Sequence, residues 1–325
     1  MFSGSSCAKQ LIAQMDNGES ILETFGDSGR RLKREIALTG FVCRLLFTYA
    51  FSPLFLLRIR LARAENRPAI WRRRKLHAIR IARLIFPFKT IGYRLNEDSA
   101  KGQIFIINHP TLNDPLCAIL FAIITYPDCE IVIPVNLPWF ESICRYRQKL
   151  LEMGIILVPI LTPKTIARLD STPKIGEIRN TFVSHYTDEL TDTLKRGGLA
   201  VVAQSATRQR HLFLDETQSK TGTSETGVEI LGTVSMMLLA IRRAKITDHA
   251  NIIPVGVIPH RPDAPAKINP FCKYTLKVGA PISANFLAQV KNPAKKLSAD
   301  LHLLQRLQAL TPSEYHFALE QEPLD

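Results

Sequence analysis

Short apolar runs alternate with longer amphipathic segments along the chain from residue 88 onward. Apolar runs of four to seven residues between turn residues are typical of buried strands. The sequence predicts strands at 103–107, 130–135, 155–158, 199–203, 252–258 and 274–278. Because these strands alternate with helical segments, the pattern predicts an α/β domain with a central, largely parallel sheet flanked by helices.

The predicted helices lie between and after these strands. The clearest covers 177–196, where apolar residues recur at every fourth position and two glycines follow the last of them. Glycine at this place commonly ends a helix. The other predicted helices are 116–124, 140–152, 226–243, 284–292 and 297–309, whereas 160–176, with two prolines and a glycine, is predicted to be a loop.

One strand is followed at once by a polar connection. After Ile104–Ile107 the chain reads Asn-His-Pro-Thr-Leu-Asn-Asp-Pro. Asp114 followed by Pro115 has the form of a helix start, a capping carboxylate with proline at the first helical position. A folded connection can bring His109 within hydrogen-bond reach of Asp114, and such a pair acts as a general base. The alternative is a surface histidine and an aspartate that only caps the helix.

Four segments in order resemble one enzyme family. Asn-His-x4-Asp at 108–114 resembles the first motif of the glycerol-phosphate and 1-acylglycerol-3-phosphate acyltransferases. Thr207-Arg208 resembles the end of that family's Glu-Gly-Thr-Arg motif, 252–255 resembles its Val/Ile-Pro motif, and 277–282 resembles its terminal strand and Gly-x-Pro turn. The resemblance covers roughly residues 85 to 290.

The resemblance implies a membrane-associated enzyme of phospholipid synthesis. It would move a fatty acyl group from acyl-CoA or acyl carrier protein to a hydroxyl of a 1-acylglycerol-3-phosphate acceptor. Glycerol 3-phosphate or another lyso-lipid is the alternative acceptor, and a lipid-binding protein without turnover is the alternative of another class. The thioester is already activated and the hydroxyl needs only its proton removed, so neither a metal nor a further cofactor is expected.

The resemblance also implies the site residues. His109 would be the general base and Asp114 would orient it, while Asn108 would shape the loop and contribute to substrate binding. The second loop follows the predicted strand 199–203, at the end of the strand where ligands bind in α/β sheets. There Arg208 offers a forked donor suited to phosphate, with Arg210 as a helper. Thr207 and Pro254 complete the predicted substrate-binding set, and a pair of surface arginines is the alternative.

The sequence departs from the family pattern in two places. Ser205 and Ala206 stand where the family has Glu and Gly, and no arginine follows Gly154 at the usual distance. Lys164 or Arg168 is a candidate to replace that missing phosphate contact. A serine hydrolase with Ser205 as nucleophile is the alternative enzyme. It is disfavoured because Ser205 does not lie in the Gly-x-Ser-x-Gly turn that such enzymes carry.

The positive charge is concentrated near one end of the chain. Of the formal net charge of +13, the segment 58–94 carries +11, with twelve Lys or Arg and one acid, Glu65. It follows the apolar stretch 36–57, which contains Arg44 and Pro53. An apolar helix beside a polybasic segment is a two-signal attachment to an anionic membrane. We therefore expect residues 1–85 to be a membrane-attachment region and 86–325 to be the acyltransferase domain.

Other interpretations of this region stay open. Residues 36–57 are long enough to span a bilayer, although a central arginine disfavours a span, and they could also form a soluble core helix. The basic run could be a solvated helix face. A nucleic-acid partner is not expected, because Trp71 is the only aromatic residue between Arg58 and Leu84 and no nucleic-acid-binding module is visible.

The cysteines and the amino terminus bear on location. The six cysteines form no C-x-x-C pair and several lie in apolar runs, which favours reduced thiols in a cytosolic protein. Residues 1–18 lack the basic and apolar parts of a secretory signal. The expected location is the cytoplasmic face of a membrane.

Overall fold

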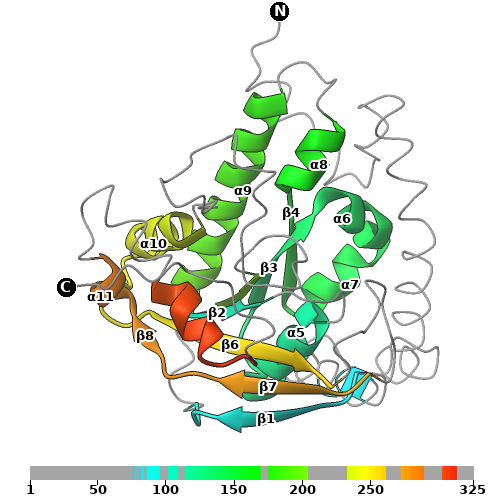
Figure 1. Ribbon diagram of the computed structural model, residues 1–325. Helices are drawn as coiled ribbons and strands as arrows, with labels where there is room; N and C mark the ends of the chain where they lie inside the picture. Colours follow the sequence, from blue (N-terminus) through cyan, green and yellow to red (C-terminus); the bar gives the residue numbers. More distant parts are fainter. Residues whose placement is uncertain are drawn as a thin grey trace, which may run out of the picture.

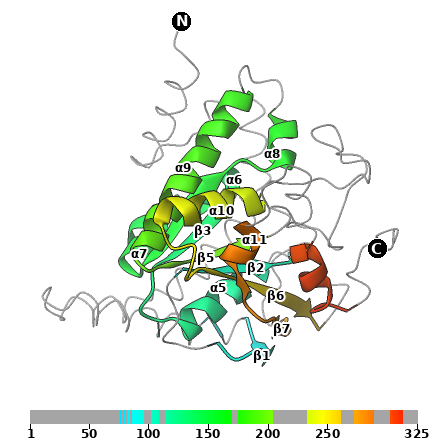
Figure 2. The ribbon, with the colours of Figure 1, turned by 90° about the vertical axis from the view of Figure 1, so that its left-hand side faces the viewer.

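A single sheet lies between two layers of helices in the computed structural model (Figures 1 and 2). The structure describes residues 76, 79, 82–83, 86–95, 102–108, 114–169, 175–203, 233–260, 272–288 and 302–312. The apolar stretch 36–57 and most of the basic run lie outside these residues, so the membrane-attachment region and its boundary at residue 85 stay predictions. Within the described ranges, no helix is both long and apolar enough to cross a bilayer.

The sheet runs in the order β1-β7-β6-β2-β5-β3-β4, and β8 pairs with β6 beside this path. Strands β6, β2, β5, β3 and β4 are parallel to one another, whereas β7 and β8 run antiparallel to β6. The predicted largely parallel α/β sheet is therefore confirmed for the described residues. The strands are β1 (Phe88–Gly92), β2 (Gln103–Ile107), β3 (Ile131–Asn136), β4 (Ile155–Ile160), β5 (Leu199–Ala203), β6 (Asn251–Pro259), β7 (Tyr274–Val278) and β8 (Ile282–Ser283).

Helices follow most of the strands, as the sequence pattern predicts. The longest, α9, closely matches the predicted helix 177–196, and the start of α5 falls at the predicted Asp114. The helices are α5 (Asp114–Thr125), α6 (Leu137–Ile143), the 3-10 turn η4 (Cys144–Tyr146), α7 (Arg147–Glu152), α8 (Pro163–Arg168), α9 (Ile175–Lys195), α10 (Thr233–Ala244), α11 (Ala284–Ala288) and a C-terminal helix at 302–308.

Both faces of the sheet are buried at its centre. Phe105 and Ile107 of β2 join a cluster with α5, α6 and α7, whereas Ile104 and Ile106 join a second cluster with α9, α10 and the C-terminal helix. Because every residue of β2 is covered, the strand is a continuous apolar run and not an alternating one. This double cover leaves the strand ends as the places where polar residues emerge from the core.

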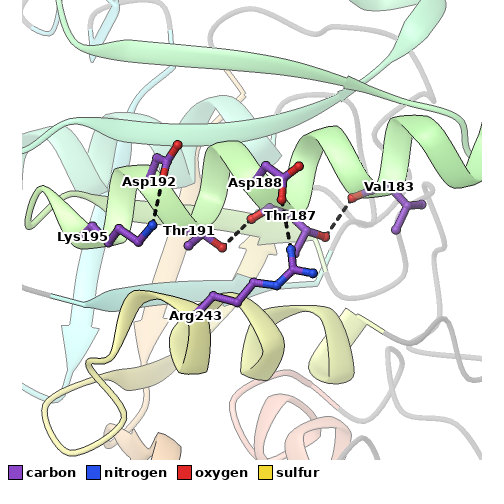
Figure 3. A network of polar contacts seen from close by, with 7 residues as sticks. All are labelled: Val183, Thr187, Asp188, Thr191, Asp192, Lys195 and Arg243. Atoms are coloured by element: carbon purple, nitrogen blue, oxygen red, sulfur yellow. Dashed lines mark hydrogen bonds and ion pairs between the residues drawn. The ribbon is translucent and has the colours of Figure 1, made fainter. Parts of the chain in front are cut away.

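Polar contacts link α9 to α10 on the second face (Figure 3). Arg243 of α10 donates to Asp188 of α9 at 3.0 Å across the two exposed helix surfaces. Along α9, the buried hydroxyls of Thr187 and Thr191 donate to the carbonyl oxygens four residues earlier, at 2.8 and 2.7 Å. Local bonds of this kind satisfy a threonine inside a helix without any partner from another element.

Two sequence predictions are corrected. The segment 160–176 is not wholly a loop, because Thr162 accepts from the Thr165 amide and caps α8, with Pro163 at the first turn. The single helix predicted at 140–152 is instead α6, a 3-10 turn and α7. Strand β1 was not predicted. The four described cysteines, at positions 117, 129, 144 and 272, form no disulfide.

Candidate functional site

The carboxyl ends of the parallel strands meet at one edge of the sheet, where ligands bind in folds of this kind. The register aligns Ile107 at the end of β2 with Ala203 at the end of β5 and with Val255 of β6. Strands β2 and β5 therefore end side by side, about 4.8 Å apart. The segments that follow them in the sequence are those predicted to carry the catalytic pair and the phosphate-binding arginines.

The residue that follows β2 is fixed by two hydrogen bonds. The Asn108 side chain donates from Nδ2 to the Val257 carbonyl at 2.9 Å, and its Oδ1 accepts from the Val257 amide at 2.6 Å. A carboxamide carries the same donor and acceptor as a peptide group. Asn108 thus extends the β2–β6 ladder by one step with its side chain, and it is only 3 % exposed. The backbone entering the His109 connection is anchored to a strand 149 residues away in sequence.

The predicted catalytic pair is only partly within the described residues. His109 and the connection through residue 113 lie outside them, and for Asp114 the structure describes the backbone alone. The connection starts at the anchored Asn108 and ends at the first residue of α5. Its two ends are therefore placed, while the His109–Asp114 pairing and the substrate-binding role of Asn108 stay predictions.

The second predicted loop also begins at a placed strand end. Residues 204–232 lie outside the described residues, and with them Ser205, Thr207, Arg208 and Arg210. Their roles stay predictions. Of the two candidates for the missing phosphate contact, Arg168 is exposed in the last turn of α8, and the Lys164 side chain lies outside the described residues.

Pro254 lies inside β6, at the point where this strand changes neighbours. Asn251 and Ile252 pair with β8, and the pairing with β7 begins at Val255. A proline without an amide hydrogen costs no ladder bond at such a junction. Its carbonyl accepts from the Gly279 amide at 2.9 Å. Pro254 thus shapes the sheet itself, and its role in substrate binding stays a prediction.

A polar cluster at the ends of β3 and β4 was not found from the sequence. Thr165 of α8 donates to Oδ1 of Asn136, the last residue of β3, at 2.9 Å. The Thr162 and Thr165 hydroxyls lie 3.1 Å apart, and both residues are 3 % exposed. Because the Thr165 proton goes to Asn136, the Thr162 hydroxyl donates to Thr165. The Thr162-Pro163 pair, a cap followed by a helix-starting proline, is the local signal that marks this cluster.

The cluster gives the carboxyl edge a second fixed polar position. Its hydrogen-bond chain orients the Asn136 carboxamide, with Oδ1 toward Thr165 and Nδ2 away from it. Asn136 is partly exposed and lies on β3, two strands from β2. The edge therefore carries two oriented asparagines. Both Nδ2 and Oδ1 of Asn108 bond to backbone groups, whereas Asn136 is bonded through its Oδ1.

Comparison with known proteins gives likenesses to solved structures alone. No protein-family model matches the chain, and no curated protein matches it. The structure is similar to that of the 1-acyl-sn-glycerophosphate (LPA) acyltransferase PlsC from Thermotoga maritima, with 12 % sequence identity and a TM-score of 0.42. The match covers 86 % of this chain and 97 % of that one. A likeness at this level assigns neither a fold nor an activity to this chain.

Proposed function

We propose that this protein is an acyltransferase of glycerolipid synthesis that works at a membrane surface. It moves a fatty acyl group from an acyl-CoA or acyl-carrier-protein thioester to a free hydroxyl of a 1-acylglycerol-3-phosphate acceptor. The proposal rests on the ordered motifs of the sequence, and above all on Asn-His-x4-Asp. It needs neither a metal nor a cofactor beyond the acyl thioester.

The structural observation that supports the proposal best is the anchoring of Asn108. A general base must be held within hydrogen-bond reach of the proton it removes, so its backbone needs a rigid support. The two bonds between Asn108 and Val257 supply that support to the residue next to His109. The alignment of Ile107 with Ala203 starts the Arg208 loop on the neighbouring strand. Base and phosphate ligand can then act on one acceptor molecule.

The chemistry follows from these roles. His109 removes the proton of the acceptor hydroxyl while Asp114 orients the imidazole and stabilises its charged form. The hydroxyl oxygen attacks the thioester carbonyl, the new ester C–O bond forms, and the C–S bond breaks. The departing thiolate receives the proton from the imidazolium. Arg208, with Arg210, holds the acceptor phosphate through charge-assisted hydrogen bonds.

The test is acyl transfer by the purified full chain in the presence of anionic vesicles. An acyl thioester is offered with 1-acylglycerol 3-phosphate, with glycerol 3-phosphate, or with other lyso-lipids. We expect turnover that His109→Ala abolishes, while the exposed control His249→Ala retains it. Substantial turnover in folded His109→Ala rejects the assignment, and no transfer to any acceptor favours a lipid-binding protein without turnover.

Two further variants separate the roles of the site. Arg208→Ala should mainly raise the KM for the acceptor, and an unchanged KM removes Arg208 from the phosphate site. Asn108→Asp loses the donor to the Val257 carbonyl and sets a carboxylate against it. We expect it to lower both kcat and the free energy of unfolding, the latter by about 1–3 kcal/mol. Full activity in Asn108→Asp would show that the anchoring is not needed.

Residues 1–85 are proposed to hold the site at the bilayer. The apolar stretch 36–57 and the basic run that follows it supply the two signals that stable attachment requires. Deleting residues 1–85 should strongly weaken binding to anionic vesicles in a sedimentation assay. Equal binding by the deleted and full chains would remove this region from the attachment.

A further inference from the structure

The outer strand of the sheet presents an exposed, mixed apolar and basic face. In β1 only Phe88 is buried, and the rest of the strand is exposed. Lys89 and Ile91 alternate along β1 and therefore point to one side of the strand, and Tyr93 follows directly after its last residue. Ile91 is 46 % exposed and Tyr93 is 51 % exposed, which is unusual for two large apolar residues so close together in the chain.

The neighbouring strand adds positive charge on the same side. The register pairs Lys89 with Thr275 and Ile91 with Lys277, so Lys277 and, two residues before Thr275, Lys273 point the same way. We call Lys89, Ile91, Tyr93, Lys273 and Lys277 the β1 face. Residues 86–95 and 272–279 contain no acid. Among the described residues, none of these three lysines forms an ion pair.

The β1 face lies at the level of the candidate site. Ile91 pairs with Lys277, and Lys277 pairs with Gly256 of β6. One step beyond the Ile107–Val255 pair, Gly256 stands beside Asn108. Three strand spacings of about 4.8 Å separate Ile91 from Asn108, about 14 Å in all. Figure 1 shows β1 at the outer edge of the sheet, next to β7 and two strands from β6.

We propose that the β1 face docks on the surface of an anionic lipid bilayer. This inference rests on the proposed function, for which it supplies a bilayer contact within the enzyme domain, separate from residues 1–85. The three lysines match the negative charge of such a surface, and each contributes about a fivefold factor to binding. Ile91 offers an apolar side chain for insertion, and tyrosine is enriched at the membrane–water interface.

Charge alone would also suit a nucleic acid, but the apolar content of the face favours a bilayer. Binding to single-stranded nucleic acid uses several aromatic platforms on which bases stack. The β1 face has one aromatic residue, Tyr93, beside an aliphatic one. An aliphatic side chain gains nothing against a phosphate backbone, whereas it is stabilised in the acyl boundary of a bilayer.

The experiment places a tryptophan on the face of the full chain. Tyr93→Trp is mixed with vesicles of phosphatidylcholine and phosphatidylserine, with and without brominated phosphatidylcholine, which quenches tryptophans inserted in the bilayer. The native Trp71 and Trp139 are subtracted by measuring the unmodified protein in parallel. The matched control is Val183→Trp, an exposed position on α9. The readout is local, so strong attachment by residues 1–85 does not hide it.

We expect the fluorescence emission of the tryptophan added at position 93 to shift to shorter wavelength and to be quenched. The tryptophan added at position 183 should show neither effect. In salt titrations, Lys89→Gln/Lys277→Gln should weaken vesicle binding at least tenfold, while Arg179→Gln/Lys195→Gln on α9 changes it less than twofold.

Three results overturn the proposal. The first is that the tryptophan at position 93 is not quenched while the protein is bound, and the second is that the protein does not bind vesicles at all. The third is that the lysine variants weaken binding to DNA but leave binding to vesicles unchanged. Acyl transfer measured in the same vesicles keeps the two proposals apart. Quenching without acyl transfer rejects the proposed enzyme activity and supports the proposed docking of the β1 face. Acyl transfer without quenching supports the activity and rejects the docking.

Discussion

The two outer strands of the sheet, β1 and β4, differ in how far they are buried. An outer strand has one row of backbone groups without a neighbouring strand and must be protected from pairing with other chains. Strand β4 is mostly buried and is packed between α9 on one side and α6 and α7 on the other. Strand β1 is exposed along four of its five residues and carries Lys89. One edge is thus covered by packed helices, and the other is exposed and carries a charged side chain.

This difference separates stability from interaction. Substitutions at the β4 side should change the free energy of unfolding, because they alter packed side chains. Substitutions at the β1 side should leave stability nearly unchanged, unless they alter the backbone. The following variants test this contrast, in order of decreasing expected effect.

The largest effect is expected at Phe182, which is 1 % exposed on α9 in the cluster that includes Leu157 of β4. Phe182→Ala should lower the free energy of unfolding by about 3–5 kcal/mol, because it removes a buried ring and leaves a cavity. Urea denaturation measures this change. The adjacent Val183, 41 % exposed, is the control, and Val183→Ala should cost less than about 0.5 kcal/mol. Similar costs for both would mean that α9 does not cover a packed edge.

The next effect is expected at Gly92, the last residue of β1. Its φ is +102°, and a Cβ atom there would collide with the Val278 carbonyl oxygen. Gly92→Ala should therefore lower the free energy of unfolding by about 1–3 kcal/mol. Gly176→Ala, at a helical position with nothing within 4 Å of its Cβ, should be neutral or slightly stabilising. If thermal denaturation shows no loss for Gly92→Ala, β1 is not held against β7 as described.

A smaller change of opposite sign is expected at Tyr186 on α9. Its hydroxyl is buried and has no hydrogen-bond partner among the residues that the structure describes, and burial raises the pKa of Tyr186 above its usual value. Tyr186→Phe removes a polar group that has lost its water without gaining a protein partner. The free energy of unfolding should rise by up to about 1 kcal/mol, as measured by chemical denaturation. A loss of more than that would indicate that the hydroxyl has a partner in solution.

The smallest effect is expected at Ile91. Ile91→Ser should change the free energy of unfolding by less than about 0.5 kcal/mol, because the side chain has little contact to lose. The same variant should weaken binding to anionic vesicles. A large loss of stability on denaturation would instead show that the β1 face is packed in solution, and would remove the contrast with β4.

Most of the parallel sheet could be predicted because its signals are local. The apolar runs of β2, β4 and β5 and the four-residue spacing of α9 are each visible within one segment. Strand β1 has no such signal, since it is mostly exposed and owes its form to pairing between Phe88 and Tyr274, far apart in the chain. Helix α8 was missed because Pro163 and Pro173 favoured a loop over a cap followed by proline.

The candidate site shows the same limit. A motif indicates His109 and Asp114, but the partner of Asn108 is a backbone group of Val257, and no side-chain pattern identifies a backbone partner. Likewise, Asn136 and Thr165 come together only because β3 and β4 are neighbours. Sequence thus identifies the residue types that carry chemistry, whereas the contacts that hold them depend on the order of the strands.

The hydrogen bonds between Asn108 and Val257 also determine when the His109 connection can be anchored during synthesis of the chain. A ribosome adds about 5–20 residues per second, so the 149 residues between the two partners take roughly 7–30 s to synthesise. During that interval the histidine loop has been made, but the strand that anchors it does not yet exist. A chain released before β6 is complete would carry the whole Asn-His-x4-Asp motif without its support. The activity proposed for this protein would then begin only after β6 has been made.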